Sequence, residues 1–221
     1  MRRYLPYAVI GAVFIMALIS GVLFFRFHQP PIVRGTTANG KPGAEPAHIR
    51  GLATAPVALE EFGDFECMPC FLLWPALRNL EHDYGDRLAV TFRQHPMIEH
   101  RRAPDAARAS EAAGLQGRFW EMHDLLYLSR SQWARADDPR AVFSVFAGRL
   151  GLDVDRFKKD LDSAEIAQRI KADWDRGESL GIDRTPVVFV NGKRAQLQSD
   201  VEQGLRADID AALDPSKTPK N

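Results

Sequence analysis

The longest apolar stretch of the chain lies at its start, where residues 4–25 include no charged side chain. Folded as a helix with a rise of about 1.5 Å per residue, they would extend roughly 33 Å, enough to cross the hydrocarbon core of a bilayer. Arg2 and Arg3 precede the stretch, and only Arg26 follows closely. By the positive-inside rule we predict an anchor over 1–27 in the inner (cytoplasmic) membrane, with the following domain on the periplasmic, extracytoplasmic side.

A cleaved signal peptide is the alternative interpretation of this stretch. The apolar region of a signal peptide is normally shorter, and residues 24–27 (Phe-Phe-Arg-Phe) make a poor cleavage site, so we favour an uncleaved signal anchor. Either outcome carries the rest of the chain out of the cytoplasm, into a compartment where disulfides persist.

Beyond the anchor, composition separates a tether, a domain and a tail. Residues 28–55 are rich in Pro, Gly, Ala and Thr, which predicts a flexible linker. Residues 56–213 have the size of one globular domain, and residues 214–221 form a polar tail. The 29 basic and 29 acidic residues balance, and no basic stripe with interleaved aromatic residues occurs, so nucleic acid is not an expected partner.

The first part of the domain shows a strand–helix–strand pattern. Residues 57–62 form an apolar run typical of a buried strand, and 88–93 alternate between apolar and polar residues as a second strand does. Between them, residues 67–84 predict a helix, with a kink at Pro75.

The second part of the domain begins with a helical region, from about 100 to 181, that contains no convincing strand. Helices are expected there at about 106–115, 119–126, 139–150, 153–161 and 163–180. An apolar strand over 187–190 follows, then an Asn-Gly turn to a short strand over 193–197, and a final helix to residue 213. The order of elements predicts an α/β domain with a helical insertion.

The only two cysteines, Cys67 and Cys70, form a Cys-Met-Pro-Cys motif at the start of the predicted 67–84 helix. A thiol at a helix N-terminus meets unpaired N–H groups and the positive end of the helix dipole, which favour the thiolate. The second thiol, about one turn along, can close a disulfide with the first, giving a redox-active pair. We predict Cys67, at the exposed helix end, as the nucleophile and Cys70 as the resolving thiol.

Two other interpretations of the motif are weaker. A zinc site needs two further ligands, and the chain offers no third cysteine; among its six histidines the best spacing is that of His95 and His100. A purely structural disulfide gains most when it closes a long loop, whereas this loop is minimal.

Three stretches, at 61–70, 117–127 and 181–192, resemble the DsbA-like thiol-disulfide oxidoreductases. They are similar to the active-site strand and loop of that family, to a signature of its insertion, and to its proline loop and hairpin. The resemblance covers about residues 48–213 and implies a thioredoxin-like fold with an all-helical insertion. One departure is Met68-Pro69 where members often carry Pro-His or Pro-Tyr; proline before the second cysteine is typical of thioredoxins themselves and leaves the redox potential open.

The resemblance also implies roles for two residues of the proline loop. Pro186 matches a cis proline beside the cysteine pair, although an ordinary trans proline that ends a loop is the commoner state of any proline. Thr185, which precedes it, would offer backbone groups to an extended substrate strand.

An acidic residue is expected beneath the cysteine pair. The resemblance places it at Glu61, where a buried carboxyl could accept or return the proton of Cys70. Strand alternation leaves open whether Glu61 or its neighbour Glu60 faces inward. Glu66, beside Cys67, is expected to be solvated.

Together these features predict a membrane-anchored thiol-disulfide oxidoreductase that acts on exported cysteine-containing proteins. A membrane redox partner would reoxidise or reduce its cysteine pair, and no cofactor or metal is expected. An oxidant is favoured by the insertion. A reductase, favoured by the anchor and by the proline before Cys70, and a non-catalytic tethered chaperone or assembly factor are the alternatives; two intact cysteines argue against the last.

Overall fold

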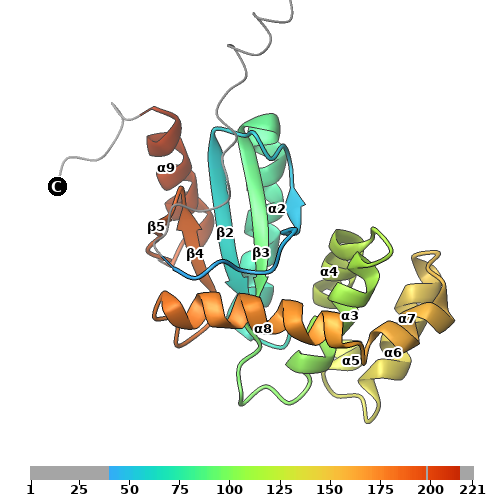
Figure 1. Ribbon diagram of the computed structural model, residues 1–221. Helices are drawn as coiled ribbons and strands as arrows, with labels where there is room; N and C mark the ends of the chain where they lie inside the picture. Colours follow the sequence, from blue (N-terminus) through green and yellow to red (C-terminus); the bar gives the residue numbers. More distant parts are fainter. Residues whose placement is uncertain (1–39, 198, 215–221) are drawn as a thin grey trace, which may run out of the picture. The chain divides into compact units, whose positions relative to one another are not determined.

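The computed structural model of the protein describes residues 40–197 and 199–214 (Figure 1). The predicted anchor over 1–27, the first part of the predicted linker and nearly all of the polar tail lie outside these residues. Among the residues that are described, no helix combines the length and the apolar character that crossing a bilayer requires.

A five-stranded sheet lies at the centre of the domain, with the strand order β1-β3-β2-β4-β5. Its strands are β1 (Ile49–Arg50), β2 (Val57–Gly63), β3 (Leu88–Gln94), β4 (Val187–Val190) and β5 (Lys193–Arg194). β2 and β3 run parallel, and the other neighbouring pairs are antiparallel. Every residue of β2, β3 and β4 is buried, because helices cover both faces of the sheet.

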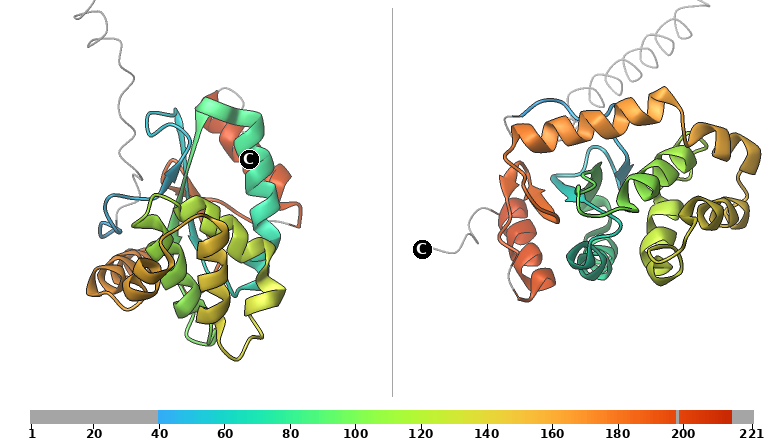
Figure 2. Two further views of the ribbon diagram at one scale, coloured as in Figure 1. Left: turned by 90° about the vertical axis from the view of Figure 1, so that its right-hand side faces the viewer. Right: turned by 90° about the horizontal axis from the view of Figure 1, so that it is seen from below.

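Helices α2 (Met68–Tyr84) and α9 (Val201–Leu213) cover one face of the sheet and share an apolar core with its strands. On the opposite face lies α8 (Ala164–Ser179), as the right-hand view of Figure 2 shows. A short 3-10 helix, η1 (Gly85–Arg87), connects α2 to β3.

The rest of the helical insertion has a core of its own, rich in alanine and aromatic residues. Its helices are α3 (Ala103–Gly114), α4 (Phe119–Leu128), α5 (Arg130–Trp133), α6 (Pro139–Arg149) and α7 (Val154–Asp160). Cys67 and Cys70 belong to this second core, so they lie where α2 meets the insertion.

Most predicted elements are confirmed, and local chemistry explains their ends. The side chains of Asp138, Asp153, Ser163 and Asp200 each accept a backbone N–H in the first turn of the following helix. The differences concern short elements: β5 ends earlier than the predicted 193–197 strand, and β1, η1 and α5 were not predicted. The kink at Pro75, which lies within α2, stays a prediction.

The linker predicted over 28–55 is too long, because residues 41–50 pack on the domain. Ile49–Arg50 forms β1, which pairs with β3. The Ala44 N–H donates to Asp173 of α8 at 2.8 Å, and the Ala44 carbonyl accepts from Arg93 of β3 at 2.8 Å. Composition could not reveal this attachment, since it depends on side chains far along the chain.

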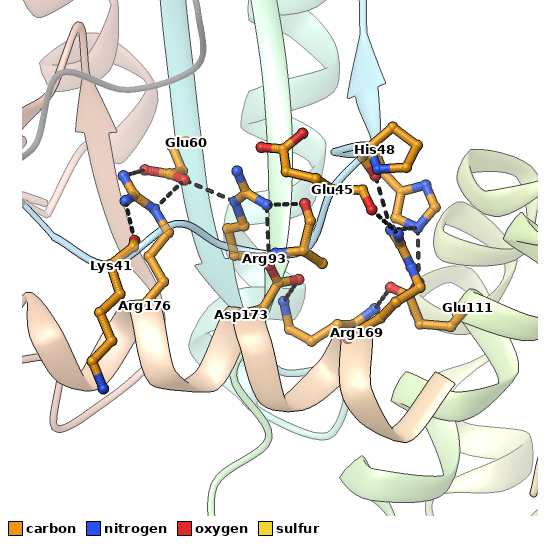
Figure 3. Close-up of polar contacts among 12 residues, drawn as sticks. Lys41, Glu45, His48, Glu60, Arg93, Glu111, Arg169, Asp173 and Arg176 are labelled. Atoms are coloured by element: carbon orange, nitrogen blue, oxygen red, sulfur yellow. Dashed lines mark hydrogen bonds and ion pairs between the residues drawn. The ribbon is translucent and has the colours of Figure 1, made fainter. Parts of the chain in front are cut away.

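Four charged side chains form a buried cluster between the sheet and α8 (Figure 3). Glu60 of β2 accepts hydrogen bonds from Arg93 at 2.8 Å and from Arg176 of α8 at 2.8 and 2.9 Å. Arg93 also pairs with Asp173 at 3.0 Å. None of the four side chains is more than 4% exposed. Because a buried charge is costly when it stands alone, this cluster ties β2, β3 and α8 together.

Candidate active site

Cys67 and Cys70 lie at the start of α2, as the sequence predicts. Cys67 is the N-cap residue, with the extended backbone of that position, and Cys70 follows in the first turn. Both thiols are free; Cys67 is 4% exposed and Cys70 is fully buried. The prediction that Cys67 is more accessible than Cys70 is therefore confirmed. Cys67 is nevertheless less exposed than its N-cap position suggests.

The two thiols differ strongly in acidity. A hydrogen bond with Cys70 lowers the pKa of Cys67 to about 6, against burial and the nearby charge of Asp64, which raise it. Burial raises the pKa of Cys70 well above its ordinary value, and its hydrogen bond to Cys67 adds to that shift. At neutral pH the reduced site therefore holds a Cys67 thiolate and a Cys70 thiol, the division that makes Cys67 the stronger nucleophile.

The proline loop reaches the reactive sulfur from the other side. When Cys67 is protonated, its thiol donates to the carbonyl oxygen of Thr185 at 3.3 Å. The Thr185–Pro186 bond is cis, as predicted. The fold thus brings a backbone segment next to Cys67 from a distance of 118 positions in the sequence.

Both acidic candidates of β2 are buried, on opposite faces of the sheet. Glu60 is held in the ionic cluster beside α8, whereas Glu61 faces the side on which α2 packs and is 2% exposed. Among the described residues, no hydrogen bond reaches Glu61 Oε1. Burial, followed by the charges of Glu81 and Cys67, raises the pKa of Glu61 to about 8. A carboxyl with this pKa can hold or release a proton near neutral pH.

Replacing Glu61 with glutamine is expected to remove a pH dependence of stability. The native state keeps a proton on Glu61 up to a pKa of about 8, whereas the unfolded chain loses it near 4.5. The free energy of unfolding therefore falls as the pH rises between these values, and glutamine, which does not titrate, abolishes that contribution. Urea unfolding of the wild-type protein and of Glu61→Gln near pH 4.5 and near pH 8 measures how the free energy of unfolding of each depends on pH. The same pH dependence in both proteins would contradict the buried, protonated state of Glu61.

Two acidic residues beside Cys67, Asp64 and Glu66, organise the loop, a role that the sequence pattern indicated for neither. The Asp64 carboxylate is buried and accepts the N–H groups of Glu66 at 2.7 Å and Cys67 at 3.2 Å. Glu66 was expected in solvent, but its carboxylate accepts the N–H groups of Arg102 at 2.6 Å and Ala103 at 3.0 Å. Glu66 therefore satisfies backbone donors at the start of α3, where Arg102 offers no side-chain cap.

The fold is similar to that of several proteins of known structure. A family model described as Thioredoxin matches residues 44–211. The oxidised crystal structure of BdbD from Bacillus subtilis is similar, with a TM-score of 0.66 and 23% identity over 81% of this chain and 99% of that chain. Wolbachia pipientis alpha-DsbA1 gives a TM-score of 0.65 and 19% identity over 77% of this chain and 92% of that chain.

Curated relatives are much longer proteins. The Na(+)/H(+) antiporter NhaA 1 of Mycolicibacterium gilvum is 35% identical over 87% of this chain, and NhaA 3 of Salinispora tropica is 42% identical over 66%. The chain spans 31% and 22% of these two proteins, so the similarity concerns a part of each. With the family match over most of the described domain, the chain belongs to the thioredoxin family, and its fold is similar to that of the DsbA-type proteins.

Proposed function

We propose that this protein exchanges disulfides with exported cysteine-containing proteins through the Cys67–Cys70 pair, and that it acts as an oxidant. The observation that carries the proposal is the placement of the two thiols at the start of α2: Cys67 is the N-cap residue beside the Thr185 carbonyl, and Cys70 is fully buried in the first turn. In this arrangement the pKa of Cys67 is lowered to about 6 and that of Cys70 is raised. A stabilised thiolate stabilises the reduced pair, which makes the disulfide form more oxidising.

The proposed oxidation proceeds in two exchange steps. A substrate thiolate attacks the Cys67 sulfur of the disulfide, the bond to Cys70 breaks, and Cys70 leaves with the electron pair and takes up a proton. A second substrate thiolate then attacks the substrate sulfur of the mixed disulfide, and Cys67 leaves as a thiolate. Two electrons pass from the substrate to the pair, and a membrane redox partner removes them again.

Glu61, Thr185 and Pro186 support these steps. Glu61, with a pKa of about 8, can supply the proton that Cys70 takes up when it leaves. The carbonyl of Thr185, 3.3 Å from the Cys67 sulfur, lies where an extended substrate strand would add its own hydrogen bonds. Pro186 follows directly and has no N–H to compete for that strand.

The direction of exchange is tested with two assays on the same preparation. The oxidised protein should accelerate disulfide formation in a reduced, unfolded substrate more than the reduced protein accelerates insulin reduction. Cys67→Ser is the control for both. A protein active only in insulin reduction would replace the oxidant proposal with a reductase, and a protein inactive in both would support the tethered chaperone.

We further propose an inner-membrane protein with the catalytic domain outside the cytoplasm, anchored by residues 1–27. The uncharged stretch over 4–25, preceded by Arg2 and Arg3, supports it. Protease added to spheroplasts, in which the outer face of the inner membrane is accessible, should digest the domain. A domain released freely into the periplasm would indicate cleavage, and a protected domain would contradict the predicted orientation.

A further inference from the structure

A buried carboxylate and a histidine form a pair beside the reactive cysteine. The Oδ2 atom of Asp64 lies 2.7 Å from Nδ1 of His100 and accepts the N–H of Met97 at 2.7 Å. Its Oδ1 atom accepts the N–H groups of Glu66 and Cys67. The side chain of Asp64 is 0% exposed, whereas that of His100 is 27% exposed. Asp64 is therefore shielded from solvent, whereas His100 is partly exposed to it.

The position of Asp64 gives its charge a direct effect on the site. Its carboxylate is hydrogen-bonded to the Cys67 backbone, and its negative charge opposes the thiolate on the same residue. A protonated His100 cancels that charge, and a neutral His100 does not. The charge state of the partly exposed His100 ring can therefore act on a sulfur that is almost fully buried.

We propose that Asp64 and His100 form a charge pair that tunes Cys67, with His100 as a positioning residue whose imidazolium favours the thiolate and makes the disulfide a stronger oxidant. This inference rests on the proposed function. It assigns a pH response to the exchange reaction, since loss of the His100 proton leaves the Asp64 charge facing the sulfur.

The acidity of His100 agrees with this role. Burial lowers the pKa of His100, but the hydrogen bond and charge of Asp64, followed by the charges of Cys67 and Glu66, outweigh it, and the net shift is upward from 6.5. Linkage is reciprocal: if the Cys67 thiolate favours the imidazolium, the imidazolium favours the thiolate by the same free energy.

Other titratable and charged groups face the pair from the elements packed around it: Glu61 of β2, Glu66 before α2, Cys70 of α2, His95 after β3, Tyr127 of α4 and Arg130 of α5. Among the described residues, none of these side chains hydrogen-bonds to the Asp64 carboxylate or the His100 ring. Burial raises the pKa of Cys70 and of Tyr127 and lowers that of His95. Glu61 remains as a group that titrates in the same range, at about 8.

The test is His100→Gln, in the full-length protein and again with Glu61→Gln. The glutamine amide can still donate to Asp64 but carries no charge. The pKa of Cys67, from the pH dependence of its alkylation rate, should rise by about one unit. The equilibrium with glutathione at pH 7 should shift about fivefold toward the disulfide, or about 20 mV. His82→Gln, which alters an exposed histidine in the last turn of α2, should change neither.

A second variant, His100→Lys, keeps a cation that does not titrate near neutral pH. It should retain a low pKa at Cys67 and lose the inflection that His100 gives the wild-type pH profile. The proposed pair would be overturned if His100→Gln had the wild-type pKa of Cys67 and the wild-type equilibrium with glutathione. It would also be overturned if His100→Lys kept the inflection of the wild-type pH profile. A wild-type protein that exchanges no disulfide would instead overturn the proposed function, so the two failures are distinguishable.

Discussion

Replacing Cys67 with serine is expected to abolish disulfide exchange, leaving the uncatalysed reaction, which takes on the order of minutes to hours. Serine is close in size, so the fold should persist, but its hydroxyl cannot form the mixed disulfide. The thiolate with the lowered pKa, about 6, belongs to Cys67, and Cys70 remains a buried thiol that substrates do not reach. The rate of oxidation of a reduced peptide, followed by mass spectrometry, measures the loss.

The matched variant, Cys70→Ala, should behave differently. It keeps the nucleophile and removes the resolving thiol, so mixed disulfides through Cys67 should accumulate and be visible on non-reducing gels. If Cys70→Ala trapped no partner while Cys67→Ser did, the two roles would have to be exchanged.

Replacing Glu60 with alanine should lower the free energy of unfolding by about 3–5 kcal/mol, the typical cost of removing one partner from a buried ion pair. Glu60 accepts from both Arg93 and Arg176, and the alanine variant takes a shared carboxylate away from two buried guanidinium groups. Urea unfolding of the wild-type protein and of Glu60→Ala measures this cost.

An exposed glutamate of the same region provides the control for that experiment. Glu178 lies on α8 near Arg176 but points to solvent, so Glu178→Ala should change the free energy of unfolding by no more than about 0.5 kcal/mol. Similar losses in the two variants would show that the buried cluster does not stabilise the domain beyond an ordinary surface contact.

Local patterns in the sequence were enough to predict most elements and the reactive pair. Capping residues such as Asp138 and Ser163, the Asn-Gly turn and the apolar runs of β2 and β4 act through near neighbours, so their effects can be read from the chain. The two cysteines are also a local signal, because their spacing and the helix that follows define the chemistry.

Long-range contacts account for what the sequence could not predict. Strand alternation leaves open whether Glu60 or Glu61 faces inward, because a sheet covered on both faces buries both. The Asp64–His100 pair joins residues 36 positions apart, and no local pattern in the sequence connects them. β1 is too short for a pattern of its own, and its position follows from pairing with β3.

The central claim, a reversible redox pair at Cys67 and Cys70, is tested most directly by its equilibrium with glutathione. The wild-type protein is equilibrated over a series of glutathione ratios, its free thiols are alkylated, and the mass is measured. We predict that both thiols become free together, in a two-electron transition with a midpoint above about −300 mV, the value below which resistant structural disulfides lie. A pair that stays fully oxidised across the series, or thiols that remain unbridged in every buffer, would contradict it.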